Sequence, residues 1–157
     1  MKSFAKALTG ITVTILILFA YTLYGTNLRV SLSAISYQPA SERAQAFENI
    51  MAAAKRGDAG ITVFADDLNG DISEYQFVTL EYTISNIGFL PAEFIELRVA
   101  PNSGDVLQID GSSEDIAGLT RSVTSAVILT RRVGNTNDYY AAVSYYILGR
   151  QHEVRSR

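Results

Sequence analysis

The longest apolar stretch of the chain lies near its N-terminus. Residues 7–25 carry no charged side chain, and Lys2 and Lys6 precede them. As an α-helix with ~1.5 Å rise per residue, this stretch would be about 28 Å long, close to the ~30 Å hydrocarbon core of a bilayer. Lysines before a span and tyrosines at its far end, here Tyr21 and Tyr24, are typical of a membrane helix. The pattern predicts a single-pass signal-anchor that crosses the lipid bilayer through residues 7–25, with a cytoplasmic N-terminus.

A cleaved signal peptide is the main alternative for this stretch. It has the same charged start and apolar middle. The run is long for a signal peptide, however, and residues 19–25 lack a small-x-small cleavage pattern. A buried helix of a soluble protein is a third reading. We therefore expect residues 1–26 to form a cytoplasmic tip and transmembrane helix, and residues 27–157 to form an extracytoplasmic domain, periplasmic or extracellular, at the cell membrane.

One segment of that domain has the apolar spacing of a soluble helix. We expect a helix over residues 41–56, with Ser41 as its N-cap and Gly57 as its C-cap. The apolar stripe comprises Ala44, Phe47, Ile50, Met51 and Ala54. The stripe is expected to cover the β domain. Docking of a partner through Phe47, Ile50 and Met51 is the alternative.

The remaining residues alternate between apolar and polar side chains, which is typical of strands. Asn86, Gly88 and Pro91 separate two such runs, which we expect to be neighbouring strands. Asn86 and Gly88 tolerate a positive φ, which would suit a turn between them. A phase slip within the first run predicts a β-bulge. The expected strands are residues 27–37, 61–65, 78–85, 95–99, 107–109, 119–130 and 139–148. The pattern predicts a mainly β protein, an antiparallel β-sandwich with one inserted amphipathic helix.

Four tyrosines fall on the last expected strand, which is apolar on both faces and therefore expected to be central. Alternation places Tyr139 and Tyr145 on one face and Tyr140 and Tyr146 on the other. We expect core packing on both faces, with an exposed interaction face for one pair as the alternative. Exposed tyrosines supply contact area at interfaces, so Tyr140 and Tyr146 are candidate partner-binding residues.

Composition narrows the function classes. The net charge is −3 and the pI about 5.1, which argues against a nucleic-acid partner. The chain has no cysteine, which excludes a disulfide framework and a thiol nucleophile. The one histidine, His152, is expected in a solvated tail, and no base is apparent beside Ser112 or Ser113. We expect no enzyme activity. Arg131 and Arg132 are expected to be solvated charges that end a strand, with contact to an acidic partner or anionic lipid as the alternative.

A short acidic segment resembles the start of a calcium loop. Asp67, Asn69 and Asp71 have the spacing that lets oxygen ligands converge. Ile72 stands where such a loop needs glycine, and Val78 stands where it needs a bidentate glutamate. We expect an Asn-Gly hairpin turn instead. A weak calcium site stays open as the alternative, and no other cofactor is expected.

The run FVTLEYTISNIGFLPAEFIELRV, followed by DIAGLTRSVTSAVIL, resembles bacterial immunoglobulin-like sandwiches of the cell-adhesion-related type. In that pattern an alternating strand ends in Asn-x-Gly, here Asn86 and Gly88. The next alternating strand and a Gly-Thr turn, here Gly118 and Thr120, follow it. The resemblance covers roughly residues 61–149, and the helix at 41–56 departs from it. It implies an immunoglobulin-like fold that serves as a spacer, an adhesion module or a subunit, without shared catalytic residues.

These observations favour a membrane-anchored, extracytoplasmic interaction or structural module within a membrane or cell-surface assembly. Only Thr26 separates the span from the first expected strand, so the domain should lie against the membrane. A protein partner or a second copy of the chain is the expected contact. The alternative is an extracytoplasmic ligand-binding module for carbohydrate, calcium or a small solute.

Overall fold

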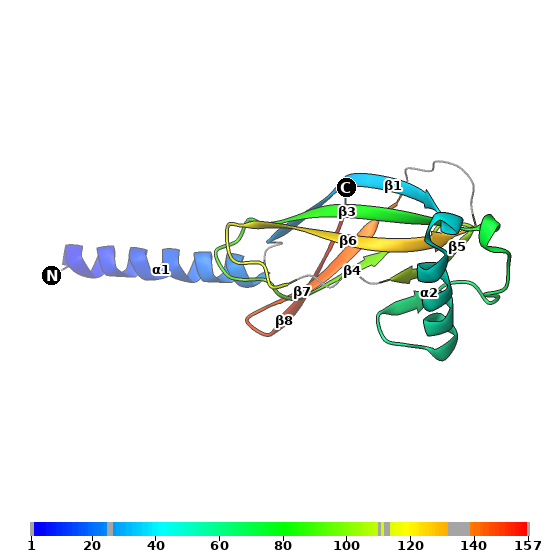
Figure 1. Cartoon of the computed structure of the whole chain (residues 1–157). Helices are drawn as coiled ribbons and strands as arrows, with labels where there is room; N and C mark the ends of the chain where they lie inside the picture. The colour runs from blue at the N-terminus through cyan, green and yellow to red at the C-terminus, as the bar shows by residue number, and fades with distance from the viewer. Residues whose placement is uncertain (1, 25–26, 110, 112–113, 132–138, 157) are drawn as a thin grey trace.

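The fold is mainly β, with two antiparallel sheets and a few helices. The computed structural model describes residues 2–24, 27–109, 111, 114–131 and 139–156. Within these residues the strands form one five-stranded and one three-stranded sheet (Figure 1). The sandwich predicted from the alternating pattern is therefore present.

The larger sheet has the order β1-β3-β6-β5-β2. Its strands are β1 (Leu28–Pro39), β2 (Ile61–Val63), β3 (Gln76–Asn86), β5 (Asp105–Ile109) and β6 (Arg121–Thr130). The register of β1 against β3 shifts between Leu32 and Ala34, which is the predicted bulge.

The smaller sheet has the order β4-β7-β8, with β4 at Glu93–Val99, β7 at Ala141–Ile147 and β8 at Arg150–Arg155. β7 is the middle strand, as its two apolar faces predict. The residues of β8 were expected to be a solvated tail, and that expectation is wrong. β8 is an edge strand that pairs with β7 from Ala142 to Ile147.

The main core lies between the two sheets. Alternate residues of β3 point into it, and Tyr82 among them is fully buried. β7 contributes from the opposite sheet, where Tyr145 is also fully buried. The other large members from the two sheets are Leu28, Val78, Leu80, Ile84, Leu97, Ile128, Val143 and Ile147.

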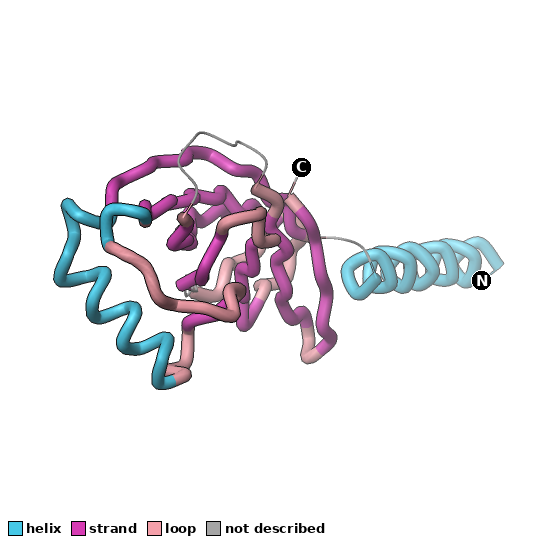
Figure 2. Tube along the Cα trace, turned by 90° about the vertical axis from the view of Figure 1, so that its right-hand side faces the viewer, coloured by secondary structure: helices cyan, strands magenta, loops and turns pink. Residues whose placement is uncertain are grey.

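A second apolar cluster covers the far end of the larger sheet. It joins Phe47, Met51 and Ala54 of helix α2 (Ala44–Arg56) to Phe77 and Leu129 of the sheet. The helix lies against that end in Figure 1 and along one side of the sheets in Figure 2. The expected packing of the stripe on the sandwich is confirmed.

The predicted start of this helix is wrong. Residues Ala40–Arg43 form the 3-10 turn η1, α2 begins at Ala44, and the side chain of Ser41 does not cap it. Ala44 is exposed rather than part of the stripe. Pro39 precedes this tight turn, which delays the helix by one turn. Gly57 ends the helix in the left-handed conformation with φ 72°, as predicted.

The Asn86–Pro91 segment has a different role from the expected one. β3 and β4, which it joins, lie in opposite sheets. Gly88 is not among the positive-φ residues, and neither is Asn86. Gly88 is required for space, because a Cβ there would lie 2.7 Å from Oδ1 of Asn27. The segment is therefore held by close packing rather than by a left-handed turn.

Helix α1 (Lys2–Tyr24) stands clear of both sheets in Figures 1 and 2. None of its apolar window from Phe4 to Tyr21 is buried within the protein. Its length and composition suit either a membrane span or a signal sequence.

Candidate functional site

The acidic loop that suggested calcium is organised by its own backbone and by an arginine. Asp67 accepts a hydrogen bond from the backbone N–H of Asn69 at 2.9 Å. Asp71 accepts from the backbone N–H and the hydroxyl of Ser73, and so caps the 3-10 turn η2 (Ile72–Glu74). These backbone and hydroxyl bonds lower the pKa of Asp71. The carboxylates therefore serve the turn, and Asn69-Gly70 is not a hairpin, because β2 and β3 are not sheet neighbours.

Arg131 supplies the positive charge beside this loop. Its Nη2 donates to the carbonyl oxygens of Asp67 and Asn69 and to the hydroxyl of Tyr75. The guanidinium carbon lies 5.2 Å from the centre of the Tyr75 ring. The hydrogen bond to Tyr75 raises the pKa of Arg131. Arg131 was expected to be a solvated charge, and instead it fastens the loop to the end of β6.

No group of three or more His, Asp or Glu side chains suited to a metal ion occurs among the described residues. The carbonyl oxygens of residues 67 and 69, which a cation could otherwise use, already accept hydrogen bonds from Arg131. Ser112 and Ser113, which were considered as nucleophiles, lie outside the described residues, as does Arg132.

The four tyrosines alternate between two faces as predicted, but the expected core packing on both faces is wrong. Tyr139 and Tyr145 are buried, Tyr140 is exposed and Tyr146 is half-buried. Tyr140 and Tyr146 lie on the outer side of β7, but six residues, or about 20 Å, separate them along the strand. Ala142 occupies the same side between them, so the two rings do not form one aromatic patch. The ring of Phe94 on β4 lies 6.0 Å from that of Tyr146, edge to face.

The helix candidates Phe47, Ile50 and Met51 mostly serve the fold. Phe47 and Met51 are buried in the second cluster, and Ile50 is half-buried against it. The Phe47 ring lies 5.1 Å from the Tyr75 ring. Of the three, Ile50 retains the most surface for a partner.

His152 is a strand residue rather than a tail residue. Its ring stacks on Tyr145 at 5.3 Å and 20°. Burial, and then the charge of Arg150, lowers the pKa of His152. Burial raises the pKa of Tyr145, whose hydroxyl accepts a hydrogen bond from the backbone N–H of Asn27 at 3.3 Å. The three residues tie the end of the smaller sheet to the point where the chain enters the domain.

Asn27 marks the end of the sandwich nearest α1, which we call the α1-side end. Its carbonyl oxygen accepts from the backbone N–H of Ile87 at 2.7 Å. The Gly88 carbonyl accepts from the N–H of Leu119 at 2.9 Å. The Phe89 carbonyl lies where a Cβ on Gly118 would be, so this loop must come close. Two loops distant in sequence therefore meet beside Asn27.

The Asn86 side chain holds these loops together. Its Nδ2 donates to the carbonyls of Leu90 and Ile116, and its Oδ1 accepts from the N–H of Gly88. The Asn-x-Gly spacing therefore has a structural cause, which the sequence alone assigned to backbone conformation.

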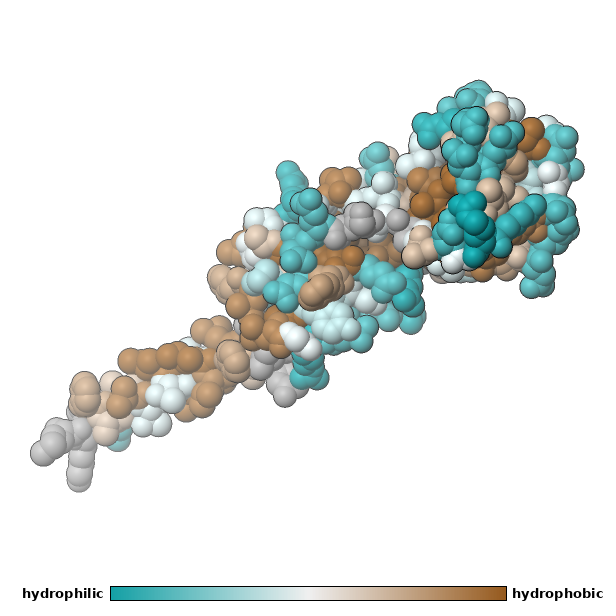
Figure 3. All heavy atoms as spheres, turned by 60° about the horizontal axis from the view of Figure 1, so that its bottom comes forward, coloured by the Kyte–Doolittle hydropathy of each residue, from teal (hydrophilic) through white to brown (hydrophobic). Residues whose placement is uncertain are grey.

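Large apolar side chains project from this end. Ile87 is 43% exposed, Phe89 77%, Leu119 64% and Leu148 60%. Leu148 forms the turn between β7 and β8, whose pairing closes at Ile147 and Arg150. We call these four residues the apolar rim. Hydrophobic side chains gather where the domain meets α1 (Figure 3).

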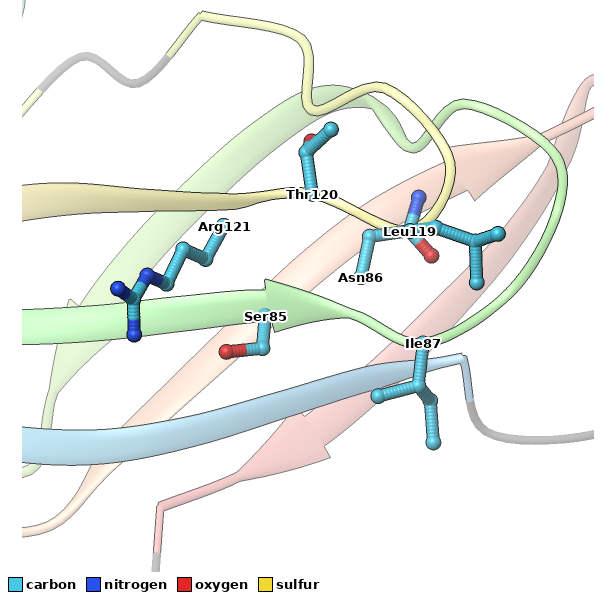
Figure 4. Close-up of a pocket in the computed structure, with 6 residues that line it drawn as sticks. All are labelled: Ser85, Asn86, Ile87, Leu119, Thr120 and Arg121. Atoms are coloured by element: carbon cyan, nitrogen blue, oxygen red, sulfur yellow. The ribbon is translucent and has the colours of Figure 1, made fainter.

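A shallow hollow of ≈ 400 Å³ opens between the loops of the rim, lined by Ser85, Asn86, Ile87, Leu119, Thr120 and Arg121 (Figure 4). A larger one of ≈ 820 Å³ runs beside it between β1 and β8 and includes Arg29 and Arg155. Sequence reasoning missed the rim, because its members are single apolar residues in separate turns. The only local signal was apolar side chains at turn positions, where polar residues are usual.

No protein-family model and no curated protein matches the sequence. Two solved structures are similar in outline. One is the GH20 exo-β-N-acetylglucosaminidase of Vibrio harveyi, at 9% identity and a TM-score of 0.39 over 83% of this chain. The chain spans only 18% of that enzyme. The other is an uncharacterised β-sandwich protein of Clostridium difficile 630, at 9% identity and a TM-score of 0.34, covering 85% of this chain and 87% of that one. Likenesses this distant carry no argument about activity.

Proposed function

We propose that the protein is a non-enzymatic, single-pass membrane protein whose extracytoplasmic domain acts as an interaction or structural module. The observation that carries the proposal is helix α1. It is 23 residues long, its apolar window is wholly unburied, and its only charged residues, Lys2 and Lys6, lie near its start. Apolar surface of this extent is costly in water, so lipid is its natural surrounding.

The strand order supports an immunoglobulin-like sandwich. With β2 set aside as an insertion, the seven remaining strands take the letters A to G in chain order. The two sheets then read A-B-E-D and C-F-G. This is the arrangement of constant-type immunoglobulin domains. Residues 61–63 extend the D edge, and α2 covers the second cluster.

The partner is a neighbouring membrane protein or a second copy of the chain. The outer side of β7 offers Tyr146 with Phe94 beside it, and α2 offers Ile50. The distance from Tyr24 to Asn27 is three residues, at most about 11 Å. A domain held this close to the bilayer favours contact with another membrane protein over capture of distant ligands.

A ligand-binding module is the second candidate, favoured by the ≈ 820 Å³ hollow between β1 and β8. Its volume suits a small solute. Tyr140 and Tyr146 are too far apart along β7 to make a single stacking platform for a sugar ring.

Two measurements test the proposal. Intact mass of the membrane-extracted protein should show residues 1–26 retained, and alkaline washing should leave the protein in the membrane. A mature N-terminus near residue 26 would make the protein a secreted one. Crosslinking followed by purification in mild detergent should then recover a partner with the wild-type protein. The double variant Tyr146→Ser with Phe94→Ser should lose this partner, and Tyr140→Ser should retain it. Equal recovery by the wild type and both variants would place the contact elsewhere.

A further inference from the structure

We propose that the apolar rim, formed by Ile87, Phe89, Leu119 and Leu148, inserts into the outer interface of the same bilayer that α1 crosses. The domain would then be fixed against the membrane at several points rather than swinging on its link. This inference rests on the proposed function, because it requires α1 to span the membrane.

The first argument is one of reach. Eighteen residues separate Ala7 from Tyr24 inclusive, and at ~1.5 Å per residue they span about 27 Å, so Tyr24 lies near the outer edge of the ~30 Å hydrocarbon core. Asn27 is three residues on, at most about 11 Å away. The headgroup region of each leaflet is about 5–8 Å thick. Asn27 is therefore confined to the interface or its immediate border.

The second argument is that the rim is bonded to Asn27. Ile87 donates its N–H to the Asn27 carbonyl, and Leu119 donates to Gly88, which packs on the Asn27 side chain. In Figure 4 the Leu119 side chain points beyond the ends of the strands, and Ile87 lies beside the start of β1. The residues that the link confines to the interface are therefore those that carry the exposed apolar side chains.

Leu148, the fourth residue of the apolar rim, belongs to the β7–β8 turn of the smaller sheet and lies at the same end of the domain as the other three. Tyr145 contacts Asn27 through its hydroxyl, and the strand continues for two residues to the turn at Leu148. In Figure 1 the β7–β8 turn lies at the end of the sandwich where α1 is attached. Leu148 adopts a φ of 49° and Leu119 a φ of 59°, conformations that a leucine seldom takes. Both leucines adopt this uncommon backbone conformation, and both side chains are exposed at this end of the domain.

The third argument is the charge that borders the rim. Arg29, Ser85 and Arg121 pair directly across β1, β3 and β6, so they form a row on the outer side of the larger sheet. Ser85 precedes Ile87 by two residues, which places the row about 7 Å behind the rim. That offset matches the thickness of the headgroup region. The rim side chains would then lie at the boundary of the acyl chains, and the guanidinium groups of Arg29 and Arg121 would lie at the level of the phosphates. This arrangement suits a leaflet that contains anionic lipids.

Two acidic groups of this end lie on the β4 side, and Glu153 on β8 is paired with Arg155. Asp115 accepts a hydrogen bond from the backbone N–H of Phe94, and Glu93 is the first residue of β4. A carboxylate is unfavourable in the interface. We therefore leave Phe94 out of the rim, although it is exposed. The β4 side of the domain is left for a protein partner.

The chain has no tryptophan, so single-tryptophan variants report on one site each. The full-length protein would be reconstituted in vesicles of phosphatidylcholine and phosphatidylglycerol, with and without lipids brominated near the headgroup end of the acyl chain. Three rim variants carry the test: Phe89→Trp, Leu119→Trp and Leu148→Trp. The brominated lipids are expected to quench most of their fluorescence. Their emission maximum should also lie at a shorter wavelength than that of a tryptophan exposed to water. Arg29→Gln with Arg121→Gln should weaken the quenching of Phe89→Trp.

Val63→Trp is the matched control. Val63 is 41% exposed. It pairs with Leu107 of β5, which in turn pairs with Leu129 of β6. Leu129 lies eight residues along β6 from Arg121. That is about 26 Å from the α1-side end. Its emission should be insensitive to the bromines. Quenching of Val63→Trp equal to that of the rim would overturn the specific insertion.

Phe19→Trp, within α1, separates the inference from the proposed function. Bromines placed deeper in the acyl chains should quench Phe19→Trp. If they do and the rim variants are not quenched, the insertion of the rim is overturned, while α1 as a membrane span is supported. The rim would then be the contact of a protein partner. Absence of quenching at Phe19 as well overturns both.

Discussion

The ring of Phe47 on α2 lies 5.1 Å from the ring of Tyr75, tilted by 48°. Tyr75 directly precedes β3, and its hydroxyl accepts hydrogen bonds from Nε and Nη2 of Arg131 at the end of β6. The contact therefore connects the inserted helix, the acidic loop and the larger sheet.

Replacing Phe47 by Ala should destabilise the domain. Large aromatic truncations in a packed site cost about 3–5 kcal/mol, and Phe47 at the border of its cluster should fall near the lower end, about 3 kcal/mol. Chemical denaturation of the full chain in mild detergent, followed by tyrosine fluorescence, measures the change. Glu48→Ala, on the exposed side of the same helix, should stay within about 0.5 kcal/mol. An unchanged midpoint for Phe47→Ala together with loss of a partner would make α2 a docking helix.

Arg131→Gln should lower the denaturation midpoint, because the amide cannot reach the two loop carbonyls and the Tyr75 hydroxyl together. Arg131→Lys should not restore it, since an ammonium lacks the planar fork of donors that these three acceptors use. Arg98→Gln is the matched control. Arg98 forms an exposed ion pair with Glu96, and such pairs contribute little to stability. A midpoint for Arg131→Gln equal to that of Arg98→Gln would show that the loop does not depend on the arginine.

Calcium should leave the melting temperature unchanged. The carbonyl oxygens of Asp67 and Asn69 are engaged by Arg131, and the Asp71 carboxylate caps η2. A ligand that binds the folded state raises its stability by mass action, so a calcium titration followed by thermal unfolding is a direct test. A rise of several degrees that disappears in Asp67→Ala and Asp71→Ala would establish a site.

Much of the fold follows from local pattern. Alternation placed Tyr139 and Tyr145 on one face and Tyr140 on the other, because strand side chains change face at every residue. The stripe of α2 followed from helical spacing in the same way. β8 was missed because it is an edge strand with mostly exposed residues, among which Val154 is the one aliphatic side chain. Only His152 and Val154 turn half-buried side chains inward, and two residues are too short an alternation to detect.

The candidate site was harder to predict because its contacts are not local. Asn86 reaches Ile116, and Arg131 reaches Asp67 across more than sixty residues of sequence. The spacing of Asn86 and Gly88 was visible, yet its cause, the packing of Gly88 on Asn27, depends on a residue more than sixty positions earlier. The apolar rim likewise exists only after three separate turns are brought to one end.

Tyr82→Phe should leave stability unchanged or raise it. Tyr82 is fully buried, and its hydroxyl has no hydrogen-bond partner among the described residues. The same is true of the hydroxyl of Thr124, which pairs with Tyr82 from β6. An unsatisfied buried polar group costs about 1–3 kcal/mol, and phenylalanine removes it while filling the same space. Tyr139→Phe is the matched change, because the Tyr139 hydroxyl donates to Oδ1 of the buried Asp105. It should destabilise by about 1–3 kcal/mol. Destabilisation of the Tyr82 variant by the same amount would reveal a partner for its hydroxyl, such as a buried water.

Stability should fall at alkaline pH, and Tyr82 should account for part of the fall. Burial raises the pKa of Tyr82 to about 12, and burial also raises the pKa values of Tyr139 and Tyr145. An unfolded tyrosine has a pKa of about 10. The folded state therefore holds the phenolic proton more tightly than the unfolded state. The stabilisation is complete below pH about 10 and is lost as the pH rises from about 10 through about 12.

The measurement is the denaturation midpoint of the full chain at a series of pH values from neutral to alkaline. The wild-type curve should be flat below pH about 10 and then decline. Tyr82→Phe has one proton fewer to lose on unfolding, so its decline should be shallower. Tyr140→Phe is the control, because it removes a phenol from an exposed position directly before β7. Parallel declines for the wild type and Tyr82→Phe would contradict this prediction. They would mean that the Tyr82 hydroxyl ionises as readily in the folded protein as in the unfolded chain, although it is buried between the two sheets.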